Sequence, residues 1–119
     1  MKYVLLFCGT REQQRAWEEM SDEARSAQYE QVGRWFAEHS AMIGPGNQLQ
    51  PPQMATTVRF QDTGESLIHD GPFLEGNEVI GGYVEITVAN LDEALRLAKT
   101  WPAHGTVEIR PVMQVDQEQ

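Results

Sequence analysis

The 119-residue sequence has little of what several functional classes require. Its single cysteine, Cys8, excludes a disulfide within the chain, and metal clusters need several Cys or His residues at set spacings. Its glycines, as in Gly44-Pro45-Gly46 and Gly81-Gly82, lack both the GxGxxG spacing and the lysine of a nucleotide-binding loop. We therefore expect no metal and no cofactor.

Basic residues are also few. The chain has 9 Lys and Arg against 18 Asp and Glu, which gives a formal net charge of −9. Nucleic-acid phosphates and anionic membrane surfaces both favour clustered Lys and Arg, so we expect neither as a partner.

A long hydrophobic run is missing as well. The largely apolar start over residues 2–8 is too short to span a membrane, is soon followed by Arg11, and lacks the cleavage site of a signal peptide. We expect a first strand there and a cytoplasmic protein. The length suits one domain over residues 1–119, with 112–119 as a polar tail.

The acidic residues are concentrated in the second half of the chain. Residues 1–60 carry six bases and seven acids, net −1, whereas residues 61–119 carry three bases and eleven acids, net −8. Asp70, Glu75 and Glu78 fall within nine residues. They are typical either of a solvated acidic loop or of a site for a cation, an amine or general acid/base chemistry.

Hydrophobic periodicity predicts two helices and five strands. One helix begins at the cap Ser21 and continues to about Ile43, and another begins at Asn90. Residues 10–20 read as a charged connection that could contain a short helical turn. Alternating apolar residues and turn signals predict the strands at 2–8, 55–60, 65–69, 83–88 and 106–110.

This order predicts an α+β fold, a ferredoxin-like split βαβ with an extra hairpin and an antiparallel sheet with two helices on one face. The other sheet face would combine apolar residues of the first strand with polar ones: Arg59, Tyr83, Glu85, Glu108 and Arg110. Because a half-apolar face is unfavourable in water, we expect a homodimer in which a second copy covers it and encloses a partly polar cavity.

The segment Asp70-Gly71-Pro72-Phe73, followed by Glu75, Glu78, Gly81, Gly82 and Tyr83, resembles the signature of the YCII-related, or DGPF, family. The resemblance extends over nearly the whole chain, including MKYVLLFCG, the stretch from Gly46 to Pro52, and the segments LDEA and VEIRP. It implies a ferredoxin-like fold that dimerises into an α+β barrel. Most members of the family are uncharacterised, some are encoded beside sigma factors, and a dehydrochlorinase of the wider superfamily uses a His–Asp pair. Asn77 departs from the lysine usual in the family.

Asp70 is the leading catalytic candidate, as a general base at a strand end; alternatively it fixes the Gly-Pro turn by accepting backbone hydrogen bonds. The adjacent His69 would point to the opposite face of an extended strand, so we do not expect a direct dyad. Arg110 could bind an anionic substrate or pair with Glu108 or Glu85, and Tyr83 could donate a proton or fill an interface. His69 and Glu78 are lesser candidates.

Two functions follow as hypotheses. The first is a cofactor-independent small-molecule enzyme of the lyase or isomerase type, in which Asp70 abstracts a proton and Arg110 or Tyr83 stabilises the negative charge. The alternative is a non-catalytic ligand-sensing or protein-interaction module linked to sigma-factor transcription control, with the acidic second half contacting a basic partner.

Overall fold

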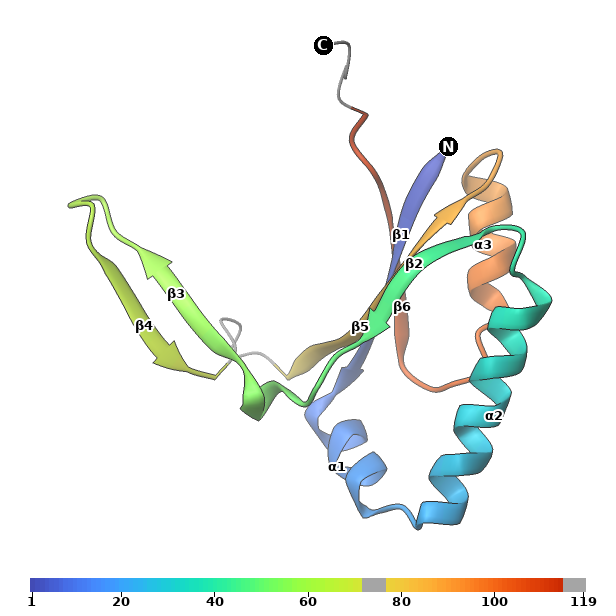
Figure 1. Cartoon of the computed structure of the whole chain (residues 1–119), viewed down its shortest axis with the longest axis horizontal. Helices are drawn as coiled ribbons and strands as arrows, with labels where there is room; N and C mark the ends of the chain where they lie inside the picture. The colour runs from blue at the N-terminus through green and yellow to red at the C-terminus, as the bar shows by residue number, and fades with distance from the viewer. Residues whose placement is uncertain (72–76, 115–119) are drawn as a thin grey trace.

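The computed structural model describes residues 1–71 and 77–114. This part of the chain contains six strands, three α-helices and one short 3-10 helix (Figure 1). Their bounds are β1 Lys2–Thr10, α1 Arg11–Glu19, α2 Asp22–Glu38, β2 Ile43–Gln48, a short 3-10 helix Pro52–Met54, β3 Thr56–Phe60, β4 Ser66–Asp70, β5 Glu78–Thr87, α3 Leu91–Lys99 and β6 Thr106–Pro111.

The main sheet has the strand order β2-β5-β1-β6, and all neighbouring strands are antiparallel. Strand β5 lies between β1 and β2, which are the two strands joined through α2, and α3 joins β5 to β6. This is the split βαβ arrangement that the sequence predicts. The α+β fold class is therefore confirmed, and β3 with β4 forms the extra hairpin as a separate two-stranded sheet.

The helix ends follow the capping signals of the sequence. The Ser21 hydroxyl accepts a hydrogen bond from the Ala24 amide at 3.1 Å, which caps α2. The Asn90 side chain caps α3 in the same way by accepting from the Glu93 amide at 3.0 Å. Both predicted helices are confirmed, although α2 ends at Glu38, earlier than the apolar spacing suggests.

Three features differ from the sequence-based expectation: helix α1 in place of a charged connection, strand β2, and the position of Arg59. Ile43 begins strand β2 rather than ending a helix, because residues 43–48 pair with β5 although their glycines and proline have low strand propensity. A β carbon on Gly46 would collide with the Tyr83 carbonyl oxygen, so the close approach of the two strands needs a glycine there. Arg59, which we placed on the open sheet face, lies instead in the separate hairpin.

The hydrophobic core lies between one face of the sheet and helices α2 and α3. Leu5 and Ile86 are fully buried there, and Trp35 of α2 packs against them. The indole N–H of Trp35 donates to the Thr100 hydroxyl at 2.8 Å, and this hydroxyl donates to the Leu97 carbonyl at 2.6 Å. Each fully buried large apolar side chain contributes roughly 1.5–3 kcal/mol, so this layer fixes α2 and α3 on the sheet.

None of the described helices covers the opposite face of the sheet, which we call the open face. Cross-strand register places Val4 between Glu85 and Arg110, and Leu6 between Tyr83 and Glu108. Two ion pairs lie on this face, Lys2 with Glu85 at 3.3 Å and Arg110 with Glu108 at 2.5 Å. The predicted mixture of apolar and charged residues is therefore present.

The β3–β4 hairpin projects away from the rest of the molecule, on the side of the sheet opposite to α2 and α3 (Figure 1). Within the described residues, its two strands pack mainly against each other. No helix of the described part is long and apolar enough to cross a membrane.

Candidate functional site

A cleft of about 1270 Å³ opens between the sheet and the first two helices. Its walls come from the end of β1, from α1 and α2, from β2 with the following Pro-rich segment, from β5, and from the loop between α3 and β6. Small-molecule sites typically enclose about 300–1,000 Å³. The cleft is therefore large enough for a metabolite-sized ligand.

Aromatic rings line the inner part of the cleft. The rings of Phe7 and Trp101 stack with centroids 4.0 Å apart and an interplanar angle of 23°. Phe36 meets Trp101 edge-on at 6.3 Å, and both line the cleft together with Phe7. Offset-stacked and edge-to-face rings are favourable arrangements, so this aromatic floor is a fixed apolar surface on which a flat ligand could lie.

Neutral amide side chains dominate the polar part of the cleft lining. Each carries both donors and acceptors of hydrogen bonds, without a net charge. They come from α1, α2, β2 and the segment that follows β2: Gln13, Gln14, Gln28, Asn47, Gln48 and Gln50. Glu18 and Arg25 also line the cleft, and their charges are opposite. The lining therefore favours neutral polar groups over ions.

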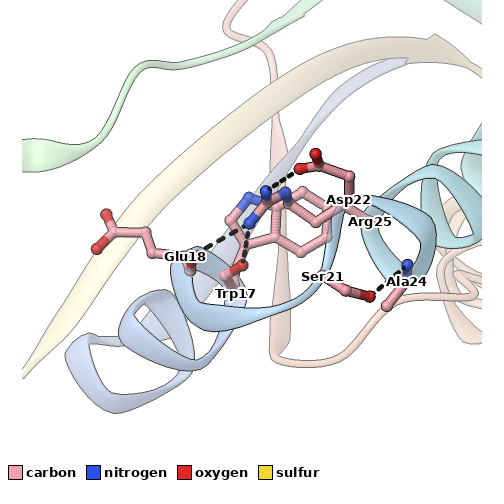
Figure 2. A network of polar contacts seen from close by, with 6 residues as sticks. All are labelled: Trp17, Glu18, Ser21, Asp22, Ala24 and Arg25. Atoms are coloured by element: carbon pink, nitrogen blue, oxygen red, sulfur yellow. Dashed lines mark hydrogen bonds and ion pairs between the residues drawn. The ribbon is translucent and has the colours of Figure 1, made fainter.

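The Arg25 side chain links the end of α1 to the start of α2, two helices that line the cleft (Figure 2). Its guanidinium donates to the last carbonyls of α1, to Trp17 O at 3.2 Å and to Glu18 O at 3.1 Å, and it pairs with Asp22 at 2.6 Å. The ring of Trp17 also packs edge-on against Tyr29 of α2, with centroids 5.2 Å apart. A cation at a helix C-terminus compensates the exposed carbonyls there.

The motif residues Asp70 and His69 lie on the hairpin and do not line this cleft. Both are exposed, and Asp70 pairs in register with Thr56. The amide of Gly71 donates to Ala55 O at 2.7 Å. The ring nitrogen Nδ1 of His69 lies 3.3 Å from the Asp70 carbonyl oxygen. Pro72, Phe73 and Glu75 lie outside the described residues.

The structure places the other candidates on two surfaces. Tyr83 lines the cleft at its border with the open face, and its hydroxyl accepts a hydrogen bond from the Asn47 amide at 3.2 Å. Arg110 lies on the open face, where it pairs with Glu108. Glu78 begins β5 opposite Thr10, close enough to Cys8 to affect its ionisation. A single chain thus brings only Tyr83 of the candidates into the cleft.

Burial raises the pKa of the Cys8 thiol above its ordinary value, and the negative charges of Glu108 and Glu78 add to this effect. The thiolate is the nucleophilic form of cysteine. Cys8 is therefore less reactive than a free thiol, which argues against covalent catalysis at this position. Within the described residues, no group of three or more His, Cys, Asp or Glu side chains could hold a metal ion.

The cleft residues of α1 were missed because residues 10–20 read as a charged connection. A signal was present in Thr10 and Gln13, which form a capping box. The Thr10 hydroxyl accepts from the Gln13 amide at 3.0 Å, and the Gln13 side chain accepts from the Thr10 amide at 2.8 Å. His104 also lines the cleft, whereas His39 caps the end of α2 and packs on Trp35.

Comparison with known proteins agrees with the family resemblance of the sequence. The profile of the YCII-related domain family matches residues 1–116. The chain belongs to this family. It is 34% identical over 116 residues to an uncharacterized protein of Rhizobium meliloti (strain 1021), an alignment that covers 94% of this chain and 92% of the relative.

Proposed function

We propose that this YCII-related protein is a homodimer that binds a small, neutral molecule with a flat apolar part in the cleft between the sheet and helices α1 and α2. The observation that carries the proposal is the pairing of an aromatic floor, Phe7 and Trp101, with a lining rich in neutral amides. Binding sites commonly combine an apolar surface with a few hydrogen-bonding groups in this way.

The open face supports the homodimer. Val4 and Leu6 lie there at the centre of the sheet, flanked by ion-paired side chains and covered by no described helix. A second copy on this face would bury the apolar centre and leave the charged residues near the rim, as in other protein interfaces.

Enzymatic proton transfer is a second and more specific proposal for this protein. It assigns Asp70 as the base and Arg110 or Tyr83 as the group that stabilises negative charge. Of these, Tyr83 lines the cleft of its own chain, which supports ligand binding more directly than proton abstraction. The sigma-factor alternative rests on the acidic charge of residues 61–119.

Titration with benzamide and benzoate, followed by amide chemical shifts in NMR, tests the binding proposal. These probes share a flat ring but differ in charge. We expect benzamide to shift amides around the cleft, and benzoate to bind more weakly because the protein carries a net charge of −9.

The Gln48→Ala variant should weaken benzamide binding about fivefold, as expected for the loss of about one hydrogen bond. Gln61→Ala is the matched control, since Gln61 is an exposed glutamine at the end of β3 and does not line the cleft. Shifts confined to other surfaces, or benzoate binding at least as tightly as benzamide, would contradict the proposal.

A further inference from the structure

The hairpin β3–β4 is a two-stranded sheet with little support from its own chain. Its root is tied by the Thr57 hydroxyl, which donates to the Gly71 carbonyl at 2.6 Å, and by the Gly71 amide, which donates to Ala55 O at 2.7 Å. Beyond this root it projects freely from the molecule (Figure 1). An isolated hairpin is at best marginally stable in water, so an ordered hairpin of this kind requires a surface to pack against.

One face of the hairpin is apolar. Val58 pairs in register with Ile68, and Phe60 lies two residues further along β3, so the three side chains share a face. Their exposed fractions are 47%, 70% and 83%. The other face carries Arg59 with its cross-strand partner Leu67. A contiguous exposed apolar stripe of this kind marks an interaction surface.

The chain exposes more surface than a compact monomer of the same mass, and the size of the excess indicates what covers it in solution. The accessible surface of the chain is 8769 Å², whereas a compact monomer of this mass exposes about 6,500 Å². The radius of gyration is 16.8 Å, against about 13.5 Å for a compact domain of this length. The excess is about 2,200 Å² per chain, and obligate homodimers bury roughly 1,000–2,500 Å² on each partner. A second copy of the chain would account for it.

We infer that the hairpin is a dimerisation arm, which docks through Val58, Phe60 and Ile68 onto the open face of the second copy. The inference rests on the homodimer of the proposed function and adds the surface that holds it together. The open face offers apolar side chains that match the arm, namely Val4 and Leu6. By two-fold symmetry each chain lends its arm to the other, and both apolar surfaces are buried at once.

The proposed docking of the arm also determines where Asp70 would lie in the dimer. Asp70 pairs with Thr56 at the root of the arm, two residues after Ile68, and so shares the apolar face of the hairpin. In the dimer its carboxylate therefore lies at the junction between the two copies rather than in the cleft of its own chain.

Sedimentation equilibrium on the wild type and on Phe60→Asp, Ile68→Asp and Leu67→Asp tests the inference, with circular dichroism to verify folding. The wild type should have twice the chain mass of 13.5 kDa. A charge in the apolar contact should weaken dimerisation at least about tenfold in Phe60→Asp and Ile68→Asp. Leu67→Asp, the matched control on the opposite face, should stay dimeric.

The possible outcomes test the docking of the arm and the existence of the homodimer separately. A dimeric wild type with equally dimeric Phe60→Asp and Ile68→Asp variants would overturn the arm and leave the homodimer standing. A folded wild type with the mass of one chain would overturn both proposals. Weakening by Leu67→Asp to the same extent as by Phe60→Asp would overturn the assignment of the docking face.

Discussion

At the scale of single residues, Cys8 shows how the surroundings of a side chain control its ionisation. Cys8 lies on β1 with its thiol partly buried, and two carboxylates of neighbouring strands, Glu108 and Glu78, act on it. Cysteine alone in a sequence invites a nucleophilic role, yet burial and negative charge both stabilise the protonated thiol. Its environment, rather than its residue type, therefore decides its reactivity.

We predict that Glu108→Gln lowers the pKa of the Cys8 thiol toward its ordinary value, because one of the negative charges that raise it is removed. The measurement is the rate of iodoacetamide alkylation against pH, whose midpoint should move to lower pH in the variant. Glu85→Gln is the control, since Glu85 is also an ion-paired carboxylate of the open face but is not a cause of the shift. Equal midpoints in Glu108→Gln and the wild type would refute this assignment.

The same raised pKa has a consequence for stability. The folded protein holds the thiol proton at a pH where the unfolded chain has lost it, so unfolding releases a proton there. The contribution of Cys8 to the free energy of unfolding is therefore fully present below the ordinary thiol pKa. It falls as the pH rises from there through the raised pKa.

At the scale of elements, sequence patterns identified those elements whose stability is local or follows a clear period. Strand β1 has apolar alternation, helix α3 has a cap, and the hairpin has turn residues; each of these signals can be recognised in the sequence alone. Strand β2 could not be recognised from the sequence. Its pairing with β5 depends on the close approach of the two backbones at Gly46, which is visible only when the partner strand is known. The cleft was missed for the same reason, since its lining comes from segments far apart in the chain.

The contacts of Arg25 that hold α1 against α2 lead to a prediction at the scale of elements. Replacing Arg25 with glutamine removes the ion pair with Asp22 and weakens the hold on the last carbonyls of α1. Because the side chain is partly exposed, we expect a loss of about 1 kcal/mol, with amide hydrogen exchange in α1 accelerated about fivefold. Arg34→Gln, an exposed position on the same helix, is the control. Unchanged exchange in α1 would show that Trp17 and Tyr29 hold the helix without the arginine.

At the scale of the whole molecule, the two sides of the sheet have different roles in this account. One side packs on α2 and α3 and, beyond them, borders the cleft; the other remains open. The sequence predicted this division as two helices on one face of the sheet and a mixture of apolar and charged residues on the other. It could not predict that the hairpin would stand apart, because the register of β3 and β4 is local whereas their packing partner is not.

The central claim is that the open face is buried against a second copy while the cleft remains accessible. Isotope-filtered nuclear Overhauser spectroscopy on a mixture of labelled and unlabelled chains tests it most directly, since only contacts between different chains give signals. The account predicts such signals from the methyl groups of Val4 and Leu6. Their absence from these methyls, with signals instead from the cleft residue Val32, would contradict it.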